Sequence, residues 1–252
     1  MNKVIRAEFG RTINAGLIIA IAGIIFSICF DSFNDLIAGL RNGQGYVGYF
    51  FSNAAFGGMC THYMLPVFTA LPFSVSLCQE RNNKAVSYIV SREGKNRYIF
   101  AKFIVSAISG GFVAACGTVL LFLMLAMRFP IAGDEFEGAV VSDYFHEWSA
   151  VYYPQLYILT LSILAFCRGV IWSSLALCVS LYTSDFMVVL LSPFLGSYVL
   201  VRIFQIIRVP DMVRPDMILI GQVVIKSSGL TLIIAIAISL TIVTLIGAFF
   251  VG

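Results

Sequence analysis

Residues 230–251 read LTLIIAIAISLTIVTLIGAFFV, a run that contains no charged side chain. About 20 apolar residues in one helix are enough to cross the roughly 30 Å hydrocarbon core of a bilayer. A helix also satisfies its own backbone hydrogen bonds, which lipid cannot do. The run therefore predicts a transmembrane helix close to the C-terminal end of the sequence.

Five further apolar runs lie upstream, and they cover Ala15–Phe30, Ala54–Cys78, Ile99–Met127, Val151–Tyr182 and Phe186–Ile207. The whole chain of 252 residues is 60% hydrophobic and only 12% charged, whereas soluble domains have roughly 25% charged residues. Pro66 and Pro72 inside the second run favour a packed bundle, because neighbouring helices must compensate for the kinks. We expect an all-α, polytopic integral membrane bundle of about six transmembrane helices, forming one domain over residues 1–252.

The connecting segments differ in character. Residues 1–12 place Val4, Ile5 and Phe9 at helical spacing beside basic residues, which indicates an interfacial helix at the membrane surface or, equally, a solvated tail. Residues 31–53 and the acidic residues 128–150 are expected to be loops on the outer side. Residues 208–229 contain an apolar run too short to cross, which favours a re-entrant or outer hairpin before the last span.

The distribution of basic residues predicts the orientation in the membrane. Of sixteen lysines and arginines, three lie in residues 1–12 and six in residues 79–102. Short cytoplasmic loops of membrane proteins are enriched in these residues. We therefore expect a multi-pass protein of the plasma membrane with the N- and C-termini in the cytoplasm, although Arg208, Arg214 and Lys226 would then lie outside.

Motifs for nucleotide, metal and acyl-transfer chemistry are absent from the sequence. Gly94-Lys95 is followed by Asn96 and lacks the upstream glycine of a phosphate-binding loop. The only histidines, His62 and His146, are far apart, and no H-E-x-x-H or G-x-S-x-G motif occurs. We expect no catalytic residues, no bound cofactor and no metal. The modest net charge of +3 also argues against a nucleic-acid partner.

Arg168 is the one charged residue in the run Val151–Tyr182. A charge at the centre of a span costs roughly 2.5–3.5 kcal/mol on the insertion scale and usually faces a bundle interior or a cavity. We regard Arg168 as a candidate residue of a translocation path that faces a substrate or partner. The alternatives are a side chain that snorkels to the interface and an internal ion pair.

The most charged stretch follows the second run. Gln79-Glu80-Arg81 precedes residues 84–90, KAVSYIV, and Ser91-Arg92-Glu93-Gly94-Lys95-Asn96-Arg97-Tyr98 leads to Lys102. In residues 84–90, Ala85, Tyr88 and Ile89 share one helical face, enough for two turns of amphipathic helix. Gly94 is suited to end that helix.

This stretch resembles the cytoplasmic loop of ABC type-two exporter permeases, in which a glutamate leaves span two, a short coupling helix follows, and a Ser/Pro-Arg element and a lysine lead into span three. Motif matching covers about 25 residues. The sequence departs from the family pattern with Ala85-Val86 in place of a Gly-Thr element and with Ser91 in place of proline.

The resemblance implies a permease subunit of an ATP-driven exporter. Residues 79–98 would be a coupling loop that contacts a separate cytoplasmic ABC ATPase, which binds ATP and magnesium. The coupling residues would be Glu80, Arg81, Arg92, Glu93, Lys95 and Arg97. A second permease subunit, identical or related, would complete the transporter in the lipid bilayer, and the expected cargo is an amphipathic or hydrophobic peptide, drug or lipid. The alternative is a membrane immunity or scaffold protein that transports nothing.

Overall fold

The structure is a computed structural model, and it describes residues 2–42, 47, 50, 58–74, 76–130, 154–221, 223, 225 and 227–251. All regular elements in this part of the chain are helices, so the all-α prediction is confirmed. The helices are α1 (Asn2–Thr12), α2 (Ala15–Asp31), α3 (Phe33–Asn42), α5 (Met59–Ala70), α6 (Ser76–Asn82), α7 (Ala85–Glu93), α8 (Lys95–Ala126), α10 (Pro154–Tyr182), α11 (Phe186–Ile207), the 3-10 turn η3 (Asp211–Val213), α12 (Pro215–Ile220) and α13 (Ser228–Val251).

Within the described residues, four helices are long and apolar enough to cross a membrane: α8, α10, α11 and α13. α1 and α2 form a bent pair whose axes differ by 56°. If the pair counts as one broken span, it is a fifth crossing. The side chain of Asn14 accepts a hydrogen bond from the Leu17 amide at that break and caps α2. These helices are compatible with a multi-pass membrane protein.

The second predicted span is divided in the structure. α5 has only 12 residues, and a turn separates its end at Ala70 from the start of α6. The Asp31 carboxylate at the end of α2 accepts hydrogen bonds from the Cys60 and Thr61 amides at 2.9 and 2.6 Å. That carboxylate accepts hydrogen bonds from amides that have no partner within α5, and it is stabilised by the positive end of the helix dipole. It thereby fixes the start of α5 beside the end of α2.

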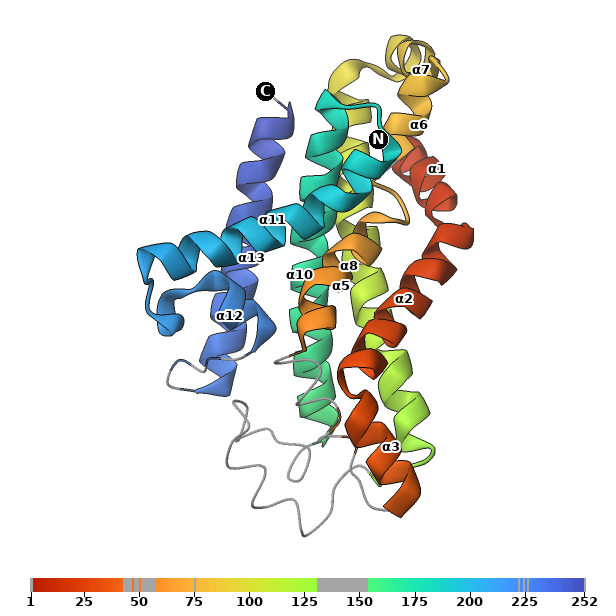
Figure 1. Cartoon of the computed structure of the whole chain (residues 1–252). Coiled ribbons are helices and arrows are strands. Elements are labelled where there is room, and N and C mark those ends of the chain that lie inside the picture. Colours follow the sequence, from red (N-terminus) through yellow and green to blue (C-terminus); the bar gives the residue numbers. More distant parts are fainter. Residues whose placement is uncertain are drawn as a thin grey trace.

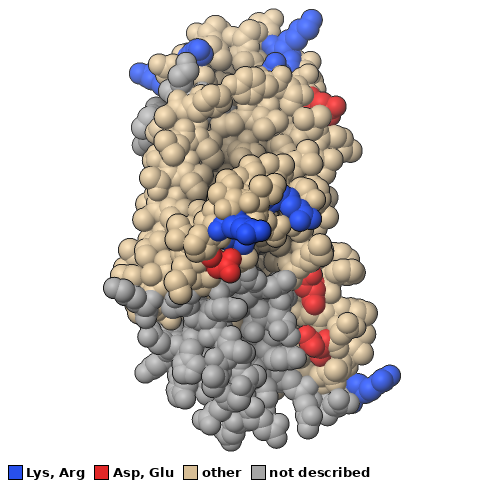
Figure 2. Space-filling model, turned by 60° about the vertical axis from the view of Figure 1, so that its left-hand side comes forward, with Lys and Arg blue, Asp and Glu red and all other residues tan. Residues whose placement is uncertain are grey.

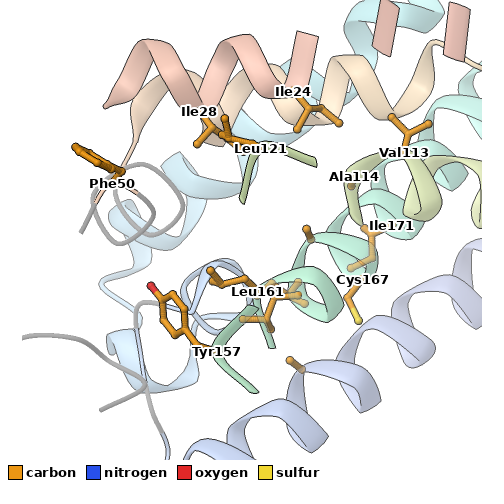
Figure 3. Close-up of a cluster of buried hydrophobic side chains, with 14 of the residues drawn as sticks. Ile24, Ile28, Phe50, Val113, Ala114, Leu121, Tyr157, Leu161, Cys167 and Ile171 are labelled. Carbon is orange, nitrogen blue, oxygen red and sulfur yellow. The ribbon is translucent and has the colours of Figure 1, made fainter. Parts of the chain in front are cut away.

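α8 and α10 pack closely along the centre of the bundle (Figure 1). A Cβ atom at Gly169 would lie 2.4 Å from the Gly110 carbonyl oxygen, so only hydrogen fits there. Small residues allow such close backbone approach between membrane helices. Figure 3 shows part of the adjoining apolar core, in which Ile24 and Ile28 of α2 lie beside Leu121 of α8.

α11 and α13 have few buried residues and lie at the outside of the bundle, with α11 running obliquely across it (Figure 1). The buried residues of α13 are Ser228, Thr231, Ala235 and Ser239, while its exposed large apolar residues include Ile233, Leu240, Leu245 and Phe249. On the face that Figure 2 shows, the belt of tan residues between the charged residues of the upper end and a small charged group midway carries no lysine, arginine, aspartate or glutamate. An uncharged belt of this kind suits contact with lipid or with another membrane chain.

The start of α1, the end of α13 and helix α7 all lie at one end of the bundle, and α3 lies at the other (Figure 1). The helical bounds predicted for residues 186–207 agree with α11, and residues 151–182 form one long helix where they are described. The expected outer loop 31–53 instead contains helix α3. Of the acidic loop 128–150, residues 131–150 lie outside the described part of the chain.

The segment predicted as a re-entrant hairpin folds into η3 and α12, followed by Gly221 in the left-handed region at φ +88°. Ile218, Leu219 and Ile220 are buried against the bundle. Arg214 pairs with Asp216 at 2.7 Å and with Asp211 at 3.2 Å. The hydrogen bond to Asp216 raises the pKa of Arg214 above its usual value.

We expect Gly169→Ala to lower the thermal stability of the detergent-purified protein. The added methyl group would force α8 and α10 apart, and overpacking of this kind typically costs about 1–3 kcal/mol. Gly10→Ala is the matched control, because no atom lies within 4 Å of the added Cβ and alanine favours the helix by about 0.5–1 kcal/mol. Equal melting temperatures for the two variants would contradict the close α8–α10 packing.

Candidate functional site

A group of four charged side chains is gathered at the end of the bundle that carries α7. Lys102 of α8 is completely buried, and its Nζ lies 2.9 Å from Glu8 Oε2 and 2.8 Å from Glu80 Oε1. Arg11 of α1 pairs with the same two carboxylates at 3.2 and 2.6 Å. We call Glu8, Arg11, Glu80 and Lys102 the charge cluster. With two cations and two anions, it carries no net charge.

Neighbouring groups complete the environment of Lys102. Its ammonium donates a hydrogen bond to Ser76 Oγ at 3.1 Å and lies 4.7 Å from the centroid of the Phe73 ring. The Tyr98 hydroxyl donates to Glu80 Oε2. Glu8 Oε2 accepts no hydrogen bond and contacts Lys102 through the ion pair alone. A buried charge is tolerated only when it is paired in this way.

The charge cluster therefore joins three separate segments of the chain. Glu8 and Arg11 come from α1, Glu80 from α6 and Lys102 from α8. Because α6 leads directly into α7, the cluster fixes the base of the segment that was predicted as a coupling loop.

α7 is a helix of nine residues, as the pattern of residues 84–90 predicted. It ends at Gly94, whose φ of +84° is readily adopted only by glycine. The predicted apolar face was wrong in one respect: Tyr88 is 77% exposed. The packed residues are Val86, Ile89 and Val90, which adjoin Leu77, Tyr98, Phe103 and Leu177.

Two of the predicted coupling residues have structural partners within the chain. Glu80 belongs to the charge cluster, and its side chain is only 12% exposed. Arg81 donates hydrogen bonds to the Ser180 and Leu181 carbonyls at 3.0 and 2.7 Å. These carbonyls are at the C-terminal end of α10, where a cation is favoured by the helix dipole. Arg81 thus joins α6 to α10.

The remaining predicted coupling residues lie at the surface. Arg92 at the end of α7 and Lys95 and Arg97 at the start of α8 are exposed. Glu93 is the last residue of α7, and its side chain lies outside the described part of the structure. With the exposed Tyr88, these residues form a basic and aromatic surface beyond the end of the bundle; we call the surface of Tyr88, Arg92, Lys95 and Arg97 the coupling surface.

Arg168 is the central residue of the 29-residue helix α10 and is only 8% exposed. In the part of the chain that the structure describes, no side chain or carbonyl forms an ion pair or hydrogen bond with it. Among the described residues Arg168 thus has no internal ion pair, and at 8% exposure its side chain does not reach the surface as a snorkelling side chain would. Arg168 instead lines two cavities.

The larger cavity has a volume of about 120 Å³ and lies among α5, α10, α11, α12 and α13. Its polar lining comes from Arg168, His62, Ser197 and Asp216, and the rest is mostly aliphatic with Trp172. The smaller cavity, about 20 Å³, is lined by Arg168 and Thr61 among apolar residues. The buried Thr61 hydroxyl has no hydrogen-bond partner. Arg168 and Thr61, neither of which has a hydrogen-bond partner for its side chain among the described residues, thus line the same small cavity.

No group of three or more metal-ligating side chains occurs among the described residues. Comparison with known proteins finds no matching family model, no matching curated protein and no matching solved structure. The geometry of the charge cluster, the coupling surface and the Arg168 cavity therefore carries the functional argument.

The sequence drew attention to Glu80 and Lys102, but it did not show which residues they pair with. Glu8 was not singled out, although it is the one carboxylate among the basic residues of 1–12. A lysine inside the apolar start of the run Ile99–Met127 needs an anion nearby, and that requirement was a usable signal. Which carboxylate meets it depends on packing between distant segments.

We expect Lys102→Met to destabilise the protein by about 3–5 kcal/mol, because two carboxylates remain buried with only Arg11 to compensate. Thermal unfolding in detergent measures this effect. The control is Lys95→Met, which removes an exposed lysine and should change stability by less than about 0.5 kcal/mol. Adding Glu8→Gln to Lys102→Met should restore part of the loss, since one unpaired anion is removed. A double variant as unstable as the sum of both single variants would contradict the pairing.

Proposed function

We propose that the chain is the membrane-spanning permease subunit of an ATP-driven exporter and that α7 receives a separate ATPase subunit. The observation that carries this proposal is the packing and exposure of α7. It is a short helix beyond the end of the bundle, with its apolar side packed on α6, α8 and α10 and its exposed side aromatic and basic. A loop that served only to fix topology needs no such support.

The supports of α7 lead into the centre of the bundle. Glu80 connects its base to α8 through Lys102, and Arg81 connects it to the end of α10. A push or pull on α7 therefore reaches α8 and α10, the pair with the closest packing. α10 also carries Arg168, so the cavity is mechanically linked to the coupling surface. An ATPase that binds one position of α7 more tightly than another would shift the bundle between two states.

The transport proposal includes six crossings with both termini in the cytoplasm. In this scheme α5 and α6 together make the second crossing, α1 lies in the interface, and residues 208–229 form a hairpin that enters the membrane from outside. The common location of α1, α7 and the end of α13 supports an even number of crossings (Figure 1). The basic coupling surface supports a cytoplasmic location for that end.

A second permease subunit completes the proposed assembly. α11 and α13 present large exposed apolar side chains, among them Leu195, Ile203, Ile233 and Leu240. These faces are available to lipid and to a second subunit, identical or related. The cargo in this proposal is an amphipathic or hydrophobic molecule, which agrees with the mostly apolar lining of the cavity beside Arg168.

The coupling surface is tested with Tyr88→Ala and with the charge reversal Arg97→Glu. We expect each to weaken the association of the tagged protein with an ATPase encoded beside it by about tenfold, since a central aromatic or arginine anchor is commonly worth 1–2 kcal/mol or more. Arg41→Glu is the matched control, because Arg41 is exposed on α3 at the opposite end of the bundle and should leave association unchanged.

Copurification from mild detergent and ATPase activity stimulated by the permease are the two measurements. Unchanged association in both coupling variants would overturn the docking role of α7. A protein that copurifies with no ATPase would instead favour a membrane scaffold or immunity function.

The orientation is tested by labelling single cysteines in a variant that lacks the six native cysteines. Ser91→Cys at the end of α7 should resist a membrane-impermeant maleimide added to intact cells and should react once the membrane is opened. Arg41→Cys on α3 should react in intact cells. Labelling of position 91 in intact cells would show that α7 faces outward, and the transporter proposal would fail with it.

A further inference from the structure

Arg168 presents an unpaired cation to a cavity that is otherwise mostly apolar. Ile171, Trp172, Leu175, Leu200 and Val201 are among the apolar residues of the lining. Arg168 is more than nine-tenths buried, and no described residue forms an ion pair with it to compensate its charge. Arginine at such a depth normally faces a partner or a pathway. A ligand that supplies an anion would satisfy both the charge and the donors of the guanidinium.

We propose that this cavity binds the anionic head of an amphipathic molecule, with a carboxylate or phosphate on Arg168 and an alkyl or acyl chain along the apolar wall. The proposal rests on the proposed export function and names its substrate class. The planar guanidinium can donate two parallel hydrogen bonds to a carboxylate or a phosphate. The aliphatic lining and Trp172 then provide the hydrophobic contact that a free inorganic anion could not use.

The other charged groups near the cavity limit the ligand to a small negative charge. Asp216 also lines it, but its two oxygens accept hydrogen bonds from Arg214 at 3.3 and 2.7 Å. Asp216 therefore pairs with Arg214, which it shares with Asp211, and it forms no ion pair with Arg168. His62 from α5 is the other titratable side chain of the lining. One unpaired cation therefore faces the ligand, which favours a single anionic group over a polyanion.

The size of the cavity agrees with a head group rather than with a whole lipid. A single water needs about 10–15 Å³ measured in the same way, so about 120 Å³ accommodates a carboxylate or phosphate with its first methylene groups. The remainder of the chain would extend outward between α11 and α13, whose outer faces are apolar. A cationic peptide is disfavoured, because its positive charge would meet Arg168.

Trp172 provides a direct measurement of binding. The sequence contains two tryptophans, Trp148 and Trp172, so the variant Trp148→Phe keeps only the one that lines the cavity. This protein, in nanodiscs of phosphatidylcholine, is titrated at mildly alkaline pH with brominated lauric acid and with its methyl ester. Bromine quenches indole fluorescence on contact. We expect the acid to quench at a concentration at least about tenfold lower than the ester, since a hydrogen-bonded charge is worth that factor or more.

The Arg168 variants identify the group that distinguishes acid from ester. Arg168→Gln should weaken the acid by about tenfold or more and leave the ester unchanged, while Arg168→Lys should retain most of the preference for the acid. Unlabelled dodecyl phosphate and lauric acid, added as competitors, show whether the phosphate, the carboxylate or both are accepted, and dodecanol should not compete.

Equal quenching by acid and ester in the Trp148→Phe protein would overturn the proposal even if Arg168→Gln fails to fold, because that comparison needs no change at Arg168. An acid preference that persists in Arg168→Gln would also overturn it. Binding is measured without any ATPase. A protein that binds the acid but fails the coupling tests would therefore refute the export function alone, and the reverse result would refute the substrate class alone.

Discussion

The buried ammonium of Lys102 is the constraint on which the cytoplasmic half of the proposed transporter depends. A lysine without solvent is tolerated only if carboxylates surround it, and the chain provides them from two distant segments. Glu8 brings α1 against α8, and Glu80 brings the end of α6 to the same point. Once these contacts form, α7 has no freedom to leave the end of the bundle, because it begins three residues after α6 ends.

In the proposed transporter, the same contacts would carry motion from one end of the bundle to its middle. α7 is packed through Val86, Ile89 and Val90 and anchored through Arg81 to the last turn of α10. α10 in turn is packed on α8 so closely that glycine is required at position 169. Rigid connections of this kind can carry a displacement from α7 to Arg168 without a continuous chain of polar contacts. Interfaces packed so closely tend to shift between discrete arrangements, and alternating access requires such shifts.

The sequence predicted what depends on local chemistry and missed what depends on packing between distant segments. The apolar runs predicted the end of α10 and both ends of α11, and Gly94 marked the end of α7, where its positive φ disfavours other residues. The division of the second span did not follow from composition, since it depends on Asp31 of α2 holding the start of α5.

The candidate site was likewise predicted only in part. Arg168 and the charged residues of the coupling segment were recognisable, because a charge stands out in an apolar run and a basic cluster stands out beside one. The role of Glu80 and Arg81 within the bundle was not recognisable, since their partners come from α1, α8 and α10. Likewise, Tyr88 was placed on one helical face with Ala85 and Ile89, but Tyr88 is exposed while Ile89 is packed.

Comparison of two of the buried cations, Lys102 and Arg168, explains why only Arg168 indicates a ligand. Lys102 has two carboxylates, a hydroxyl and an aromatic ring around it, so its charge serves to hold helices together and the site is already complete. Arg168 has none of these within the described chain, yet it lies at the centre of a long helix. A fold that gained nothing from that charge would be more stable with an aliphatic residue there, since replacing a buried charge by a well-packed apolar group is often stabilising. The uncompensated cation is therefore better explained by a molecule that enters the bundle than by the bundle itself.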